Sequence, residues 1–379
     1  MKLSDFDYNL PKELIAQQPA CPRDSSKLMI LNRRSKKIEH KHFYVIVNYF
    51  KKGDVLVLNN TKVFPARLIG RRADTGGKME VFLLKKIEDH RPKTEENWQA
   101  LIGNRRKKAG QIIEFGRRLR CEIVGRINEA VWEVKFNKSG YQLEKLVDEI
   151  GEVPTPPYIK IEDLRSKTKK LKSEYQTVYA EQRGSVAAPT AGFHFTKPLI
   201  AKLKKKGVQF EFITLHVGLG TFMPVKPQDI KKHKMHKEFA VIDRQTAGRL
   251  NQVKAEGRRI IAVGTTAVRT LEAFSRKSQV PRRKFQRNLK SKVSSYKVKP
   301  QQKWTDMFIY PGYKFKFIDG MITNFHLPKS TLLMLVSAFA KAPADKSALL
   351  GSKFILSVYK SAIKNKYRFY SFGDSMFIV

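Results

Sequence analysis

Residues Gly184 to Phe195 read GSVAAPTAGFHF, and the alternation of strands and helices that decides the fold begins directly after them. Nearly all of these residues are small or apolar, in a chain that is otherwise rich in lysine. Small residues let a backbone approach a ligand, glycine adopts angles that other residues avoid, and backbone N–H groups in such loops bind anions. Read alone, the segment fits a tight turn better than a binding loop. The sequence that follows it makes a binding loop the better interpretation.

Beyond this segment, stretches with helical spacing alternate with apolar stretches typical of strands. An earlier run, VLVLNNT at 55–61, fits a strand buried on both faces. The predicted helices are 196–206, 244–256, 267–274, 329–340 and 353–364, and the predicted strands are 55–61, 208–216, 258–264, 314–323 and 367–379. This alternation predicts an α/β fold.

Residues 63–158 have a different pattern, because short β-rich runs are separated by glycine, asparagine and charged turns. Such spacing suggests an antiparallel barrel, and the proline-dense GEVPTPPYI at 151–159 closes the segment. We therefore expect a layered α/β main domain built discontinuously from 1–62 and 159–379, with an inserted antiparallel β-barrel domain at 63–158.

The formal net charge is +41, which favours a polyanionic partner, and nucleic acid is the abundant one. A lysine-rich proteome would explain part of this excess without any partner. Residues 276–303 hold eleven basic residues and no acidic one, so we expect an exposed, mobile, basic loop there.

Several classes of protein are excluded by what the sequence lacks. Cys21 and Cys121 are the only cysteines, too few for a disulfide framework or a cysteine-rich metal site. No run is long enough to span a bilayer, and the first residues lack the apolar core of a signal peptide. P-loop, HExxH and nucleobase deaminase motifs are absent. We expect a cytoplasmic, soluble monomer without membrane contact.

The unusual polar residues gather in loops that follow predicted strands: 216–221, 264–266, 323–326 and 373–374. Ligands of open α/β sheets bind at the carboxyl ends of the strands, so these loops predict one binding site. A lone loop histidine is more often structural, but His194, His216 and His326 each follow an apolar segment. His233 and His236 with Glu238 leave metal binding as a minor alternative, and we expect no metal.

Nine segments in order along the chain resemble one known family: LIAQQPACPRDSSKLMIL, DVLVLNNTKVFPARL, GEVPTPPYI, YQTVYA with GSVAAPTAGFHF, TLHVGLGTFMPV, HKMHKE, VGTTAVRTLEA, FIYPGYKFKFIDGMITNFHLPKSTLLMLVSAFA and YRFYSFGDSM. This is the S-adenosylmethionine:tRNA ribosyltransferase-isomerase family of queuosine biosynthesis. Phe193 and Met223 stand where we expect Leu and Arg, and the basic loop at 276–303 is longer than usual.

The resemblance implies an α/β sandwich with an inserted β-barrel, and a reaction between S-adenosylmethionine and tRNA. The ribosyl part of S-adenosylmethionine is transferred to 7-aminomethyl-7-deazaguanine at the wobble position and rearranged to an epoxycyclopentane. The product is epoxyqueuosine, and adenine and methionine are released. S-adenosylmethionine is a co-substrate, and no other cofactor is implied.

This chemistry lets us assign hypothetical roles to the residues of the loops. The proton-transfer candidates are His194, His216, His326 and Asp374. The candidates for binding S-adenosylmethionine are Gly184, Ala191, Gly192, Gly218, Gly220, Thr265, Thr266, Arg269 and Asn324. The candidates for binding tRNA or its base are Arg23, Asp24, Asn60, Arg67, Arg71 and Arg72, with the basic loop.

Two alternatives from other classes remain at this point. A non-catalytic basic tRNA-binding factor would explain the charge but leave the polar loops unexplained. An S-adenosylmethionine-dependent RNA methyltransferase would release S-adenosylhomocysteine, and the weak dinucleotide-type glycine pattern at Gly218 and Gly220, followed by prolines, counts against it.

Overall fold

The structure is a computed structural model that describes residues 1–87, 94–103, 107–116, 118–156, 158–159, 171–218, 225, 228–277, 296–341, 347 and 349–379. Two of the sequence-based predictions fall outside these ranges. Gly220 is one, and most of the basic loop predicted at 276–303 is the other.

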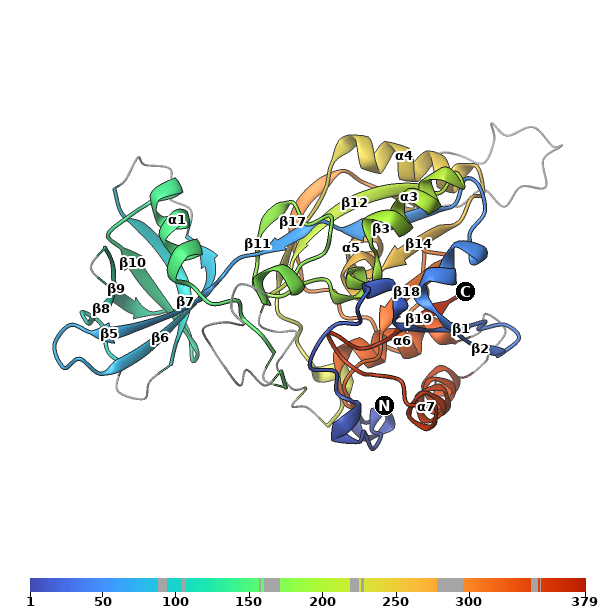
Figure 1. The fold of residues 1–379 in the computed structure, drawn as a ribbon, viewed down its shortest axis with the longest axis horizontal. Coiled ribbons are helices and arrows are strands. Elements are labelled where there is room, and N and C mark those ends of the chain that lie inside the picture. Colours follow the sequence, from blue (N-terminus) through green and yellow to red (C-terminus); the bar gives the residue numbers. More distant parts are fainter. Residues whose placement is uncertain are drawn as a thin grey trace.

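The main domain is built on a mixed sheet of nine strands (Figure 1). In order across the sheet they are β17 (Gln301–Thr305), β13 (Glu238–Ile242), β12 (Gln209–His216), β3 (Val55–Asn59), β14 (Ile260–Val263), β18 (Gly320–Asn324), β19 (Ser375–Ile378), β1 (Lys27–Leu31) and β2 (Ile38–His42). The central strands β12, β3, β14 and β18 are parallel to one another. β19 is antiparallel to β18 and parallel to β1. The carboxyl ends of the four central strands therefore meet at one edge of the sheet.

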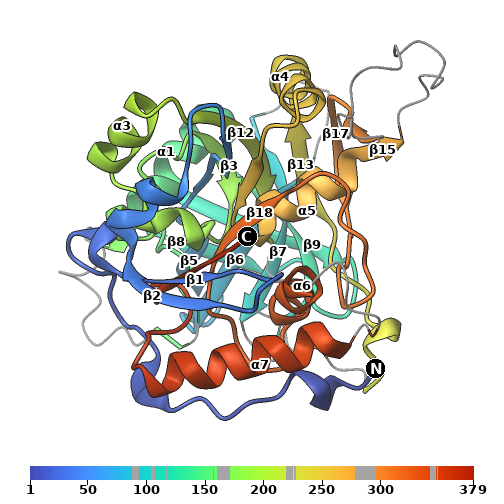
Figure 2. The same cartoon turned by 90° about the vertical axis from the view of Figure 1, so that its right-hand side faces the viewer.

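Helices cover both faces of this sheet because its central strands are apolar on both sides. Val55 and Val57 pack with α4 (Arg244–Ala255), α5 (Thr265–Phe274), α6 (Thr331–Ala340) and α7 (Leu349–Lys364). Leu56 and Leu58 pack against α3 (Lys197–Lys205) and the 3-10 helix η4 (Phe43–Tyr49) on the opposite face. Figure 2 shows α3 and α5 on opposite sides of the sheet.

Six further strands form a closed antiparallel barrel beside the main domain (Figure 1). They are β5 (Arg67–Arg72), β6 (Lys78–Lys86), β7 (Glu96–Gly103), β8 (Ile112–Phe115), β9 (Leu119–Arg126) and β10 (Val131–Phe136). Helix α1 (Gly140–Ile150), which the sequence analysis did not predict, packs on the barrel core through Leu143 and Val147. These elements all lie inside 63–158, the segment in which the sequence predicts an inserted domain.

Two short strands join the barrel to the main sheet. β4 (Thr61–Val63) follows β3 directly and pairs in parallel with β11 (Gln182–Ser185), which leads into the segment at 184–195. β15 (Ser275–Lys277) and β16 (Tyr296–Val298) form a separate hairpin that lies largely inside 276–303, as does the start of β17, so the ends of the segment predicted to be a mobile loop are strands. The predicted fold class is confirmed as a layered α/β domain with a closed antiparallel barrel.

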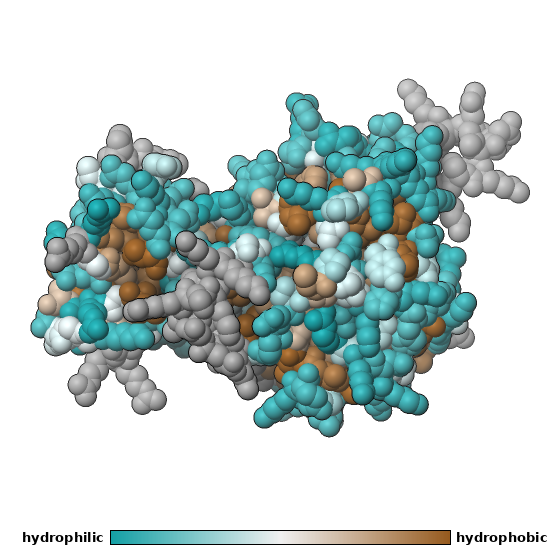
Figure 3. Space-filling view, in the orientation of Figure 1, coloured by the Kyte–Doolittle hydropathy of each residue, from teal (hydrophilic) through white to brown (hydrophobic). Residues whose placement is uncertain are grey.

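The surface is largely hydrophilic. Figure 3 shows one face of the molecule, which is mostly hydrophilic with scattered apolar patches. Across the residues described above, no helix is both long enough and apolar enough to cross a membrane.

Candidate active site

A cavity opens at the edge where the central strands end. Its wall is formed by the loop from β14 into α5 (264–266), the loop after β18 (323–327) and the small-residue segment 187–191, with Val217 after β12. Tyr370 and Ser371, shortly before β19, complete it. Three of the four loops predicted to meet thus contribute to this wall; the loop at 373–374 does not, although Tyr370 and Ser371 shortly before it do.

His326 is the proton-transfer candidate whose side chain lines this cavity. Its Nε2 lies 2.8 Å from Thr323 Oγ1. Its backbone is fixed by two tyrosines, since the Tyr8 hydroxyl donates to the His326 carbonyl and the His326 N–H donates to Tyr359. Burial lowers the pKa of His326 to about 3, so the imidazole is neutral at physiological pH. The imidazole is thus a neutral group at the cavity wall, and the burial that keeps it neutral also weakens it as a base.

His194 is buried between two polar side chains instead of facing the cavity. Its Nδ1 lies 2.7 Å from Ser26 Oγ and its Nε2 lies 3.2 Å from Asn324 Oδ1. The Asn324 amide group donates to the carbonyls of Tyr370 and Ser371, so Oδ1 must be the acceptor. Nε2 of His194 therefore carries the proton, and the Nδ1 lone pair is taken by the Ser26 hydroxyl.

The position of His194 also makes its charged form unfavourable. His194 is only 3% exposed, and the centroid of its ring lies 5.0 Å from that of Phe43. Burial lowers its pKa to about 4, against a smaller opposing effect of the Asn324 hydrogen bond. In this arrangement His194 holds Asn324 in the cavity wall.

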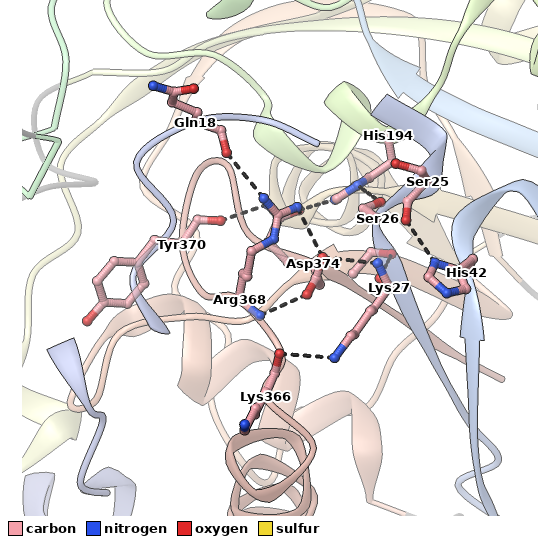
Figure 4. A network of polar contacts seen from close by, with 12 residues as sticks. Gln18, Ser25, Ser26, Lys27, His42, His194, Lys366, Arg368, Tyr370 and Asp374 are labelled. Atoms are coloured by element: carbon pink, nitrogen blue, oxygen red, sulfur yellow. Dashed lines mark hydrogen bonds and ion pairs between the residues drawn. The ribbon is translucent and has the colours of Figure 1, made fainter. Parts of the chain in front are cut away.

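Asp374 is buried within the turn that precedes β19 (Figure 4). Its carboxylate accepts hydrogen bonds from the backbone N–H groups of Lys27 and Arg368, at 3.0 and 2.8 Å. The Arg368 guanidinium lies 3.3 Å from the same carboxylate and also donates to the Gln18 carbonyl. Asp374 thus joins β1 to the 368–374 turn and does not line the cavity.

His216 and the glycines of the 184–195 segment lie beside the cavity. His216 Nδ1 is 2.8 Å from Thr61 Oγ1, and burial lowers its pKa. A Cβ at Gly184, where φ is +148°, would lie 2.8 Å from the His216 ring, and one at Gly192 would overlap the Tyr179 hydroxyl. The two glycines therefore allow close packing, and neither lines the cavity.

Four of the residues predicted to bind S-adenosylmethionine are brought together in the cavity wall: Ala191, Thr265, Thr266 and Asn324. Thr266 Oγ1 is buried and has no hydrogen-bond partner. It sits in the first turn of α5, where backbone N–H groups have no partner inside the helix. This part of the wall is suited to an anion.

Arg269, one turn further along α5, faces away from the cavity wall. Its guanidinium pairs with Glu238 on β13 and donates to the Met307 carbonyl at 3.0 Å. Glu238 also accepts from the Gly218 N–H at 3.3 Å, so this buried pair ties α5 to the loop after β12. Neither Arg269 nor Gly218 lines the cavity.

The predicted tRNA-binding residues lie in two places. Arg23 donates to the carbonyls of Ser173, Glu174 and Gln176, and Asp24 accepts from Thr196, so both fix the main domain locally. Asn60 donates to Glu181 and accepts from Thr214 beside the linking strands.

The other three arginines are on β5 of the barrel. Arg67 pairs with Glu80 and Glu152, Arg72 pairs with Asp74, and Arg71 is exposed. Their strand belongs to the barrel and does not pair with any strand that ends at the cavity.

Three tyrosines of the cavity wall, Tyr158, Tyr175 and Tyr370, were missed by the sequence analysis. Tyr158 and Tyr370 pack with ring centroids 4.6 Å apart, and the Tyr158 hydroxyl lies 2.7 Å from Ser371 Oγ. Burial raises the pKa of Tyr158 to about 12, so it stays protonated. Tyr158 and Tyr370 stand in the segments PPYI and YRFYSFGD, and the second of these leads into the predicted loop at 373–374.

Two of the three residues considered as possible metal ligands, His233 and Glu238, have other partners. Glu238 is paired with Arg269, and the ring of His233 packs against Phe308. Within the ranges that the structure describes, no three His, Cys, Asp or Glu side chains are grouped as metal ligands would be.

Comparisons with known proteins agree on one family. The family model described as "Queuosine biosynthesis protein" matches residues 3–378. Curated proteins named S-adenosylmethionine:tRNA ribosyltransferase-isomerase from Thermoanaerobacter sp. (strain X514) and Sulfurihydrogenibium sp. (strain YO3AOP1) are each 49% identical over 381 residues, covering 100% of both chains. The crystal structure of an S-adenosylmethionine tRNA ribosyltransferase from Thermotoga maritima has a TM-score of 0.51 and 35% identity, covering 99% of this chain and 100% of that one.

The two buried neutral histidines predict an acid-sensitive stability. Their folded pKa values, about 4 for His194 and about 3 for His326, lie below the ordinary 6.5. The unfolded chain therefore binds more protons below pH 6.5, and the free energy of unfolding falls as the pH drops towards 4. Each histidine contributes a slope of up to about 1.4 kcal/mol per pH unit.

Urea unfolding measured from pH 7 to pH 4 checks this prediction. His194→Gln keeps hydrogen-bonding groups near Ser26 and Asn324 but cannot titrate, so its free energy of unfolding should depend less steeply on pH. His42→Gln, at an exposed histidine, should keep the wild-type slope. An unchanged slope in His194→Gln would contradict the assignment.

Proposed function

The chain belongs to the queuosine biosynthesis protein family, and we propose that its strand-end cavity carries out the transfer and isomerisation of the ribosyl part of S-adenosylmethionine. The protein is an S-adenosylmethionine:tRNA ribosyltransferase-isomerase. It attaches this unit to 7-aminomethyl-7-deazaguanine at the tRNA wobble position, giving epoxyqueuosine, adenine and methionine. The observation that supports the location is that His326, Thr266 and the Tyr158–Tyr370 pair share one cavity wall.

His326 is the proposed base for the first proton transfer. The sulfonium of S-adenosylmethionine acidifies the adjacent C5′ protons, so a positioned base can remove one of them and form an ylide. A base must be unprotonated and must reach the substrate. His326 lines the cavity and is neutral because burial lowers its pKa to about 3; the same burial makes it a weak base, so the transfer relies on the acidity that the sulfonium gives the C5′ protons. His194, His216 and Asp374 then act by fixing the wall around it.

The first turn of α5 is the proposed site of the methionine carboxylate. Thr265 and Thr266 line the cavity there, and the unpartnered Thr266 hydroxyl can donate to a carboxylate oxygen. The positive end of the α5 dipole adds to this attraction. Ala191 leaves room for the ligand, and Gly184, Gly192 and Gly218 shape the adjoining backbone.

The aromatic pair of Tyr158 and Tyr370 is the proposed wall for a purine ring. Asn324, whose amide orientation is fixed by His194, is placed to orient the sugar or the base through its remaining lone pair. Adenine must leave with an added proton, and a neutral Tyr158 hydroxyl is a hydrogen-bond donor at this wall.

The tRNA is proposed to contact both parts of the chain. Basic residues of the barrel, among them the exposed Arg71 and the half-buried Arg72, would bind phosphates, with Arg67 beside them. Arg23, Asp24 and Asn60 would act on the main-domain side by fixing the backbone near the cavity. The inserted domain at 63–158 and the main domain at 1–62 and 159–379 are thus proposed to share the RNA, together with the basic loop at 276–303.

The remaining proposals concern how the enzyme works in the cell. We propose a cytoplasmic monomer, since its RNA substrate and S-adenosylmethionine are both found there. The sulfonium supplies the leaving group and the acidity that the reaction needs, so S-adenosylmethionine is proposed to act as a co-substrate without a further cofactor or metal.

The proposed function is tested by incubating the purified protein with S-adenosylmethionine and a tRNA that carries the 7-aminomethyl base. Mass spectrometry should find adenine and methionine in equal amounts, and a nucleoside enlarged by the rearranged ribosyl unit. S-adenosylhomocysteine would indicate methyl transfer instead. Tight tRNA binding without any product would indicate a binding factor.

Replacing His326 should affect the chemical step. His326→Ala is expected to lower kcat by about 10² to 10⁴-fold, the usual contribution of a general base, while S-adenosylmethionine still binds. Added imidazole should restore part of the activity, which a purely structural defect would not allow. His236→Gln, at an exposed histidine, is the control and should retain wild-type kcat. A kcat within about threefold of wild type would exclude His326 as the base.

Replacing Thr266 should affect S-adenosylmethionine binding. Thr266→Val keeps the shape but removes the hydroxyl, so KM for S-adenosylmethionine should rise about tenfold or more with little change in kcat. Thr177→Val is a matched control, because Thr177 Oγ1 is also buried without a partner but lies outside the cavity wall. Equal effects of the two variants on KM would contradict the proposed carboxylate site.

A further inference from the structure

A row of three aromatic rings crosses the edge of the main sheet. His216 on β12 is directly opposite Phe239 on β13, which is directly opposite Trp304 on the edge strand β17. The ring centroids are 6.3 Å apart for the first pair and 5.4 Å apart for the second. We call His216, Phe239 and Trp304 the aromatic row.

The aromatic row is on the open face of these strands. The alternate residues of β13, Glu238, Ala240 and Ile242, are at most 4% exposed and belong to the buried face. Trp304, by contrast, is 43% exposed, and Phe239 is half-buried. Large aromatic side chains left open beside a binding site often mark a surface for a partner.

The aromatic row lies between the two parts of the molecule. Figure 1 shows β17 at the end of the main sheet that is nearest the barrel. Lys85, from the end of barrel strand β6, places its Nζ 4.2 Å from the centre of the Trp304 ring. At the other end of the row, His216 contacts the linking strands, through Thr61 on β4 and Gly184 on β11.

One end of the aromatic row is adjacent in the chain to a residue of the active-site cavity. Val217 follows His216 and lines the cavity, where it pairs with Ala187. The row therefore begins one residue from the cavity wall, where the nucleotides nearest to it would be those next to a base held in the cavity. Taking a base out of its stack leaves the adjacent bases without a partner on one side.

We propose that the aromatic row is a stacking platform for unpaired bases of the tRNA anticodon loop next to the wobble base. Aromatic side chains stack on any base, because every base has a π face, and basic residues hold the phosphates. Lys85 at the row and the net charge of +41 are complementary to RNA. This inference rests on the proposed function, since it takes the ligand to be tRNA.

The test measures binding of an unmodified anticodon stem-loop RNA to the full chain, without S-adenosylmethionine. Trp304→Ala should weaken binding about 5- to 100-fold, the range expected for losing one stacked base. Trp304→Phe keeps a π face and should bind within about threefold of wild type. Trp304→Leu keeps apolar contact with the barrel but has no π face, so it should resemble Trp304→Ala.

A matched control is provided by another exposed aromatic residue. Tyr141, on α1 of the barrel, is 80% exposed, and Tyr141→Ala should bind RNA as the wild type does. Tryptophan fluorescence gives a second readout that does not depend on a destabilising variant. The chain has three tryptophans, and the part of the RNA-induced quenching due to Trp304 should disappear in Trp304→Phe.

Several outcomes would overturn the proposal. Wild-type affinity in Trp304→Leu would mean that the indole only packs against the barrel, and equal affinity in all variants would mean that RNA does not reach it. Loss of a dimer in Trp304→Ala, with unchanged RNA binding, would assign the row to a second copy of the chain. Product formation by the wild type is measured separately, so failure of the proposed function is distinguishable from failure of the platform.

Discussion

The parallel alignment of β12, β3, β14 and β18 is the constraint on which the site depends. Strands that run in the same direction bring the loops at their carboxyl ends to one edge of the sheet. β19 runs in the opposite direction beside β18, so the turn before it reaches the same edge. The barrel is inserted just after β3, through β4, and therefore also starts from this edge. One topological choice thus places the cavity, the aromatic row and the barrel on the same side of the molecule.

Most polar side chains at this edge hold the backbone instead of facing the cavity. Asn59 bonds both backbone groups of Leu215 as well as the Thr61 N–H, and Asp374 binds two backbone N–H groups. Loops buried at strand ends have backbone groups that the sheet does not pair, and leaving them unpaired costs free energy. The result is a wall whose shape is set before a ligand arrives, which is what electrostatic stabilisation of a reaction requires.

Local patterns predicted the regular elements well where the hydrogen bonds are local. Helices α3 and α4 end within one residue of the predicted bounds; β3, β12, β14 and β19 lie within the predicted runs, and β18 extends one residue beyond its run, to Asn324. The predicted strand at 314–323 is too long, because the N–H groups of Lys316, Phe317 and Ile318 bind the Glu272 carboxylate instead of a neighbouring strand. The sequence around 316–318 does not reveal that the partner of these N–H groups is Glu272 on α5.

The candidate site was predictable as a set of loops but not as a set of atoms. His194 and His326 both follow apolar segments, and only tertiary contacts separate them, because Ser26 and Asn324 occupy both nitrogens of His194. The aromatic row depends even more strongly on tertiary structure, because the register of strand pairing sets it. A shift of one residue between β13 and β17 would turn Trp304 towards the buried face. Local sequence therefore supplies the type of chemistry, whereas strand pairing decides which side chain meets the substrate.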